Sequence, residues 1–130
     1  MKYTLGKEER LKSKKLIEKL YREGNSVKNF PLRLVYVQTN HTSNFPAQMG
    51  VSVAKRNFKL AVNRNRIKRL MRECYRKQKY IVYENIKKPH VFMISYIGRE
   101  EITYDELYIK MRVLLEKFVS DINNNPHENI

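Results

Sequence analysis

Residues 61–76 read AVNRNRIKRLMRECYR, and this stretch decides what kind of fold the chain can have. Its apolar side chains recur at the three- and four-residue spacing of one helix face; they are Ile67, Leu70, Met71, Cys74 and Tyr75. Most of its basic side chains fall on the opposite face. The pattern predicts an amphipathic helix over about residues 60–80, with one face buried against a core and a cationic face in water.

The positive charge of the chain is concentrated around this helix. The 130 residues include 27 Lys and Arg against 13 Asp and Glu, which gives a net charge of +14. Residues 55–79 hold eleven of the bases and one acid, Glu73, so their net charge is +10. A helix face that serves only solubility normally carries interspersed Glu. The segment therefore indicates a binding surface for a polyanion.

The other elements follow from hydrophobic periodicity and turn residues. We expect a helix at 13–23, a weakly indicated strand at 25–30, strands at 31–38, 47–54 and 90–97, and a helix from 103 onward. Thr103 and Glu106 have the spacing of a capping box at the start of that last helix. We expect strands 31–38 and 47–54 to pair, and residues 80–89 to form a linker, because they show no clear period.

These elements predict an α+β fold, with three helices packed on a small, mixed, mostly antiparallel sheet of about four strands in the order αβββαβα. The length suits one domain over residues 1–122. Residues 123–130 are polar, and we expect a disordered tail there.

The residue types needed for catalysis or for a resident metal are poorly represented. Cys74 is the only cysteine, which excludes a disulfide framework and a zinc site built from cysteines. The three histidines show no metal-ligand spacing, and no Walker or Rossmann glycine pattern is present. We therefore expect no catalytic residue and no metal ligand. No apolar run approaches membrane-spanning length and residues 1–10 lack a secretion signal, so we expect a cytoplasmic protein.

Residues 50–58 and 61–76 together resemble the bacterial ribonuclease P protein component. The first stretch reads GVSVAKRNF, and the second contains the Arg64-Asn65-Arg66 run that matches the RNR signature of that family. The resemblance covers roughly residues 7 to 120. It implies an RNA-binding subunit that binds a large catalytic RNA and precursor tRNA, with no DNA or membrane partner. In that family the RNA, with bound magnesium, removes the 5′ leader of precursor tRNA, and the protein alone binds no cofactor.

The resemblance also assigns residues to two surfaces. The positions that match the family's contact with the catalytic RNA are Arg64, Asn65, Arg66, Lys68, Arg69 and Arg72. The family's cleft for the leader lies between its first helix and the sheet; the matching positions are Ile17 and Tyr21, Leu34 and Tyr36 or their neighbours on the strand, and Ser52, Lys55 and Arg56. The family has a left-handed βαβ crossover, although the general rule for such units favours the right hand.

The chain departs from the family at Ile17, where an aromatic residue is common, and near Lys59, where a glycine is usual. Three other functions stay open from the residues alone. The basic helix also suits a structural RNA-binding protein, such as a ribosomal one. A protein-only nuclease lacks its metal ligands here, and a membrane-surface helix would need the apolar face that the core requires.

Overall fold

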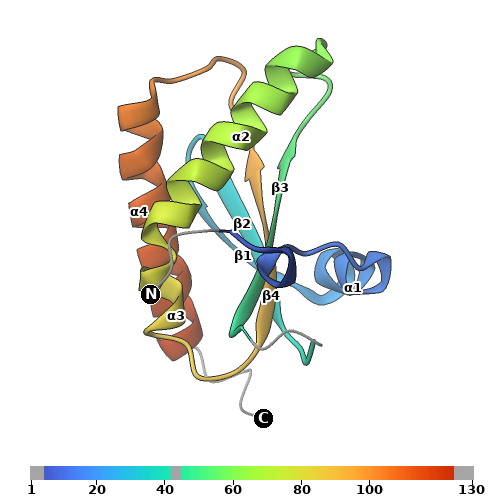
Figure 1. The fold of residues 1–130 in the computed structure, drawn as a ribbon, viewed down its shortest axis with the longest axis vertical. Helices are drawn as coiled ribbons and strands as arrows, with labels where there is room; N and C mark the ends of the chain where they lie inside the picture. The colour runs from blue at the N-terminus through green and yellow to red at the C-terminus, as the bar shows by residue number, and fades with distance from the viewer. Residues whose placement is uncertain (1–4, 42–44, 125–130) are drawn as a thin grey trace.

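The structure is a computed structural model that describes residues 5–41 and 45–124. Within these residues the chain forms a short 3-10 turn, four strands and four α-helices (Figure 1). In chain order they are η1 (Lys7–Glu9), α1 (Lys14–Glu23), β1 (Asn25–Asn29), β2 (Leu32–Gln38), β3 (Ala47–Val53), α2 (Ala61–Gln78), α3 (Tyr80–Tyr83), β4 (His90–Tyr96) and α4 (Tyr104–Asn124). The predicted α+β class and the strand at 25–30 are confirmed.

The strands form one sheet in the order β1-β2-β4-β3. β4 is antiparallel to β2 and parallel to β3, so it separates the two strands that we expected to pair. The expectation that 31–38 and 47–54 are partners is therefore wrong. The physical reason lies in β4, whose almost continuous apolar sequence is buried on both faces and needs a neighbour on each side.

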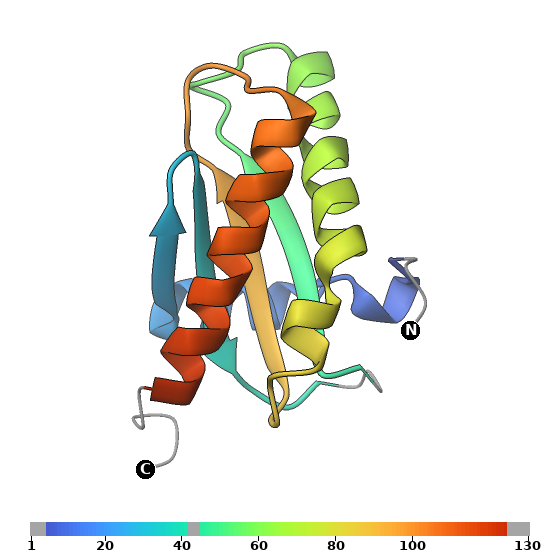
Figure 2. The same ribbon diagram turned by 90° about the vertical axis from the view of Figure 1, so that its left-hand side faces the viewer.

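The connection from β3 through α2 to β4 is left-handed. Figure 2 views the sheet with α2 and α4 in front, and both parallel strands run upward with β3 to the right of β4. The chain therefore rises along β3, descends through α2 toward the viewer and re-enters the sheet to the left. The resemblance to the ribonuclease P protein component predicted this hand, against the general preference.

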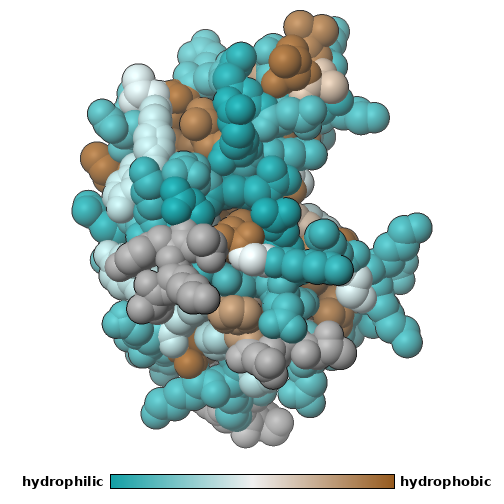
Figure 3. Space-filling model, in the orientation of Figure 1, coloured by the Kyte–Doolittle hydropathy of each residue, from teal (hydrophilic) through white to brown (hydrophobic). Residues whose placement is uncertain are grey.

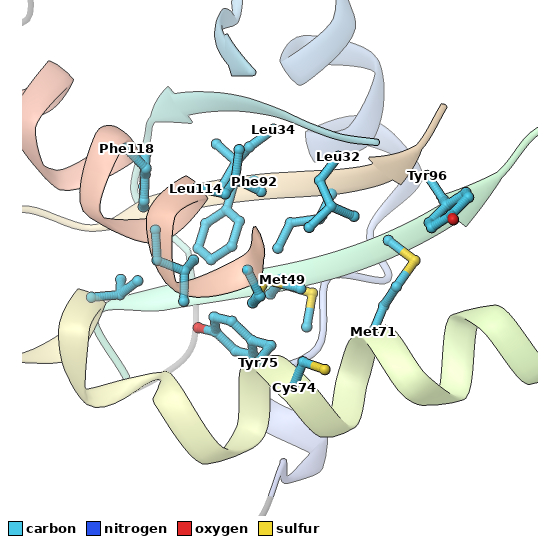
Figure 4. Packing of buried hydrophobic residues seen from close by; sticks show 14 of the residues in the cluster. Leu32, Leu34, Met49, Met71, Cys74, Tyr75, Phe92, Tyr96, Leu114 and Phe118 are labelled. Atoms are coloured by element: carbon cyan, nitrogen blue, oxygen red, sulfur yellow. The ribbon is translucent and has the colours of Figure 1, made fainter. Parts of the chain in front are cut away.

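The two faces of the sheet pack against different helices. On β2, alternate residues point to opposite sides, as the pleat requires. Leu32, Leu34 and Tyr36 enter the main core with α2, α3 and α4, where Phe92 and Phe118 also lie (Figure 4). Val35 points to the other side and joins a smaller cluster under α1. The layers are therefore three helices, the sheet, and α1 alone.

α4 begins with the predicted cap. The backbone N–H of Glu106 donates to Thr103 Oγ1 at 3.2 Å, and Thr103 Oγ1 donates in turn to Glu106 Oε1 at 3.1 Å. The helix continues to Asn124, so the first residues of the predicted tail are helical. The rest of that tail, residues 125–130, lies outside the described residues.

Residues 80–89 form a structured junction, and our expectation of a linker is wrong for their first half. α3 adds a further helical turn directly after α2, and both Val82 and Ile86 are buried in the core. At the same junction Lys79 is 1% exposed and donates to Glu9 Oε2 at 2.6 Å. Tyr83 donates to the same oxygen at 2.6 Å. This buried pair attaches η1 to the end of α2.

Candidate nucleic-acid interface

α2 carries a groove lined by cationic side chains. The groove has a volume of about 420 Å³ and is lined by Val62, Asn65, Arg66, Arg69 and Arg72. Apart from one exposed valine, these are polar or charged residues spaced three or four apart, so they share one face of the helix. The opposite face holds Ile67, Met71 and Cys74 in the core. Burial of that stripe fixes the helix, so the groove stands on a rigid support.

The bases of α2 differ in how free they are to bind a partner. Lys68, Arg69 and Arg72 make no side-chain hydrogen bond or ion pair with any residue that the structure describes. Arg64, in contrast, donates from Nη1 to the carbonyl oxygens of Phe58 and Lys59, each at 2.8 Å. It thereby closes the loop before α2. The unpaired cations of the helix lie in its middle, on its exposed side.

Arg66 is held by an acid from another part of the chain. Its Nε donates to Glu101 Oε1 at 3.0 Å, and its Nη2 donates to Glu101 Oε2. Hydrogen bonding to the Glu101 carboxylate raises the pKa of Arg66, so the guanidinium stays charged. This pairing occupies one edge of the guanidinium and leaves Nη1 for a further acceptor.

The positive charge at the C-terminal end of α2 is partly neutralised by Glu73. Glu73 accepts from Arg76 within the helix and lies 3.7 Å from Lys77. The hydrogen bond from Arg76 lowers the pKa of Glu73. The bases of α2 ahead of this cluster include three without an acidic partner among the described residues: Lys68, Arg69 and Arg72.

A second polar surface lies on the face of the sheet that carries α1. Arg33, Ser95 and Ser52 face one another across β2, β4 and β3. The Ser52 and Ser95 hydroxyls lie 2.7 Å apart, and Arg33 is exposed. The neighbouring residues toward α1 are apolar and covered. This row is therefore the part of that face that α1 leaves open.

The predicted leader-cleft residues fall into two groups. Ile17 lies on α1 and packs, partly buried, against the smaller cluster on the sheet; Tyr21 is 55% exposed one turn later, and Ser52 lies in the open row. Lys55 and Arg56 are exposed just beyond the end of β3. These five surround the sheet face that carries α1.

Leu34 and Tyr36 do not belong to this surface, and their assignment is a correction. Both are fully buried on the opposite side of the sheet, in the core with α2 and α4. Tyr36 also donates its hydroxyl to Asp121 Oδ2 of α4. The pleat of β2 sends their neighbours Arg33 and Val35 toward α1 instead.

Sequence reasoning missed Arg33 and Ser95. The signal for Arg33 was the alternation of residues 31–38, in which a single charge interrupts an apolar strand. The sequence could not show that Arg33 lies on the same face of the sheet as α1, because that depends on where α1 packs. Ser95 had the same weak signal within an apolar run.

Within the described residues, no group of three or more His, Cys, Asp or Glu side chains gathers closely enough to hold a metal ion. In that same part of the chain, no helix combines the length and apolarity that crossing a bilayer requires.

Comparison with known proteins assigns the chain to a family. The family model described as Ribonuclease P matches residues 5–119. The ribonuclease P protein component of Porphyromonas gingivalis (strain ATCC 33277) is 36% identical over 91 residues, which cover 69% of this chain and 66% of that relative. The corresponding protein of Borreliella burgdorferi is 34% identical over 107 residues, which cover 81% of this chain and 85% of the relative. The match to the first of these thus spans just under two thirds of its length.

Solved structures share the fold. The RNase P protein of Staphylococcus aureus superposes with a TM-score of 0.67 at 22% identity, covering 85% of this chain and 94% of that chain. The RNase P protein of Thermotoga maritima gives 0.68 at 21% identity, covering 84% and 96%. With the family model matching most of its length, the chain belongs to the ribonuclease P protein family.

Proposed function

We propose that this chain is the RNA-binding protein subunit of a ribonuclease P, in which a catalytic RNA removes the 5′ leader from precursor tRNA. The observation that carries the proposal is the rigid cationic groove of α2, in which Arg69 and Arg72 have no acidic partner among the described residues. Arginine donates paired hydrogen bonds to phosphate, and the exposed amide of Asn65 can reach a base edge or a 2′-hydroxyl. Family membership supports the catalytic RNA as the partner of this groove.

The sheet face that carries α1 suits the leader. A single-stranded leader of variable sequence needs contacts to its backbone and to the faces of its bases. Arg33, Lys55 and Arg56 supply exposed charge, and Tyr21 supplies an exposed aromatic ring on α1. The Ser52 and Ser95 hydroxyls add donors and acceptors between them.

The proposal gives the protein no chemical step. Its described acids, histidines and cysteine form no group of three or more that could hold a metal ion. The magnesium that the reaction needs would be held by the RNA. The protein would act in the cytoplasm by stabilising the active RNA and holding the leader.

Cleavage of precursor tRNA by the cognate RNA at low magnesium, with and without the protein, tests the proposal. We expect the protein to raise the rate, and no gain would refute a role in the holoenzyme. Co-purification with ribosomal RNA in place of one RNA of ribonuclease P type would instead favour a structural RNA-binding protein.

Removing the free bases of α2 tests which surface binds the RNA. Arg69→Ala with Arg72→Ala should weaken binding of the catalytic RNA. Each lost phosphate contact should flatten the slope of log affinity against log salt by about 0.7–0.9. Arg69 and Arg72 are the sharper choice, because Arg64 and Arg66 have partners within the protein. Lys87→Ala with Arg112→Ala removes two exposed charges outside α2 and should leave the slope unchanged.

A further inference from the structure

The N-terminal end of α2 exposes two large apolar side chains. Leu60 is 63% exposed and Val62 is 66% exposed. Figure 3 shows a hydrophobic patch at the upper end of the molecule, where α2 begins. Single exposed apolar residues are ordinary on a protein surface. Two of them together beside a cationic groove call for an explanation.

Neither residue is explained by the stability of the helix. Leu60 is the N-cap residue and makes no side-chain capping bond, whereas Ser, Thr, Asp or Asn would accept one. Val62 has a lower helix propensity than alanine, and its side chain buries little surface. The fold would therefore be served as well or better by a polar N-cap and an alanine.

Val62 lies beside the arginines of α2, and Leu60 is the N-cap residue two positions before it. Val62 lines the same groove as Asn65, Arg66 and Arg69. The contact of Arg64 with the preceding loop fixes this end of the helix, because its guanidinium spans two carbonyl oxygens of residues 58 and 59. A partner held by the groove thus meets a fixed apolar surface at its end.

The chemistry of this combination selects the occupant. Charge complementarity with the arginines requires a polyanion. Phosphates and riboses have no apolar surface to place on a leucine and a valine, and an A-form duplex keeps its base faces stacked inside. A base that is unpaired and turned out of its stack supplies both an apolar face and flanking phosphates.

We propose that Leu60 and Val62 form a platform for one unpaired base of the catalytic RNA, while Arg66, Arg69 and Arg72 hold the flanking phosphates. The inference rests on the proposed function and adds a base contact to an electrostatic surface. It makes the α2 site selective for folded RNA with an exposed base over plain duplex.

Binding of the full-length protein to its cognate ribonuclease P RNA across a salt series tests the platform. Val62→Ala should weaken binding about three- to tenfold, from the loss of the valine's buried methyl groups. The salt slope should not change, because no phosphate contact is lost. Ile109→Ala, at a 51% exposed position on α4, is the matched control and should bind as the unchanged protein does. A fully paired RNA of similar length should show no effect of Val62→Ala.

The outcomes separate this inference from the proposed function. If Val62→Ala binds the RNA undiminished while the double variant Arg69→Ala/Arg72→Ala binds it more weakly, the platform is overturned and the RNA-binding groove is kept. Full binding by both variants overturns the groove as well. A flattened slope for Val62→Ala, or an equal loss on duplex RNA, shows disturbed electrostatics and also overturns the platform. Val62→Thr keeps the branched shape with one methyl exchanged for a hydroxyl, so a loss there confirms that apolar contact is what binds.

Discussion

The two faces of the sheet are made by the same strands but are covered by helices to different extents. One face is covered by α2, α3 and α4, and the tilted rings of Phe92 and Phe118 pack there with 4.9 Å between their centres. Among the described residues, the other face carries Leu11 and the ten residues of α1, which cover Val35, Val91 and Met93 and leave the row from Arg33 to Ser52 open. A short helix cannot cover a four-stranded sheet. The covered face therefore supplies stability, and the open face supplies a surface for a ligand.

Replacing adjacent residues of β4 gives the largest expected effect and tests this contrast directly. Phe92 points into the main core, and Met93 lies under α1. Phe92→Ala should lower the free energy of unfolding by about 3–5 kcal/mol, through lost burial and the cavity that remains. Met93→Ala should cost about 2 kcal/mol, at the low end for a buried methionine. Denaturant unfolding measures both, and equal losses would contradict the proposed division between the faces.

The buried pair at the edge of the sheet gives the next largest effect. Glu9 and Lys79 join the N-terminal segment, which also donates from Leu11 N–H to Met49 O at 3.0 Å, to the end of α2. Glu9→Gln leaves a buried lysine without its counter-charge and should cost about 3 kcal/mol. Amide hydrogen exchange at Leu11 should accelerate.

The exposed neighbour Glu8 provides the control for that substitution. Glu8→Gln should change the free energy of unfolding by less than about 0.5 kcal/mol. If the two variants behaved alike, the buried pair would not be what joins the two sides of the molecule.

A smaller effect on stability depends on pH and arises from Cys74, which is buried on the face of the sheet covered by α2, α3 and α4. Burial raises the pKa of the Cys74 thiol to about 11. The unfolded chain ionises this thiol near its ordinary value of about 8.5, so it binds fewer protons than the folded protein above that pH. The contribution of Cys74 to stability is therefore complete below about pH 8.5 and is lost as the pH rises toward 11.

Unfolding midpoints measured at pH 7 and pH 10 check this sign. Compared with the original protein, Cys74→Ala should lose less stability between the two pH values, because it has no thiol to ionise on unfolding. The buried tyrosines contribute equally in both proteins. A steeper loss in Cys74→Ala would show that the thiol is not protected from ionisation.

The smallest effect on stability is expected on the open face. Arg33 is exposed and has no side-chain partner among the described residues, so Arg33→Ala should change the free energy of unfolding by less than about 0.5 kcal/mol. The affinity of the Arg33→Ala variant for a single-stranded leader RNA should nevertheless fall several-fold, since one charged contact is lost. Arg112→Ala, on the exposed side of α4, should leave leader binding unchanged, and an equal loss there would remove Arg33 from the proposed leader surface.

Local patterns predicted the elements well where the pattern was strong. The amphipathic stretch around Ile67 became α2, and the capping box at Thr103 became the start of α4. The prediction of a linker at residues 80–89 failed because α3 is only one turn long, which is too short to show a period. Its helix is held by contacts of Val82 and Ile86 with the core, which lie outside the local pattern.

The site was predicted where it depends on one element and missed where it depends on two. The bases of α2 share a face because the helix repeat places them there. The cleft residues Leu34 and Tyr36 were assigned to the wrong side, because a strand pattern distinguishes two faces without saying which helix covers each. The pairing of Arg66 with Glu101, 35 residues away, was equally invisible in the pattern.

The sequence by itself determined the four strands, the helices α1, α2 and α4 and the cationic surface, because periodicity and charge are properties of neighbours along the chain. Only the tertiary structure decided that β4 lies between β2 and β3, which sheet face α1 covers, and that Glu9 meets Lys79 across 70 residues. Those outcomes depend on which buried surfaces fit together over long separations. Packing and the desolvation of charge settle them, and neither can be deduced from a local window of residues.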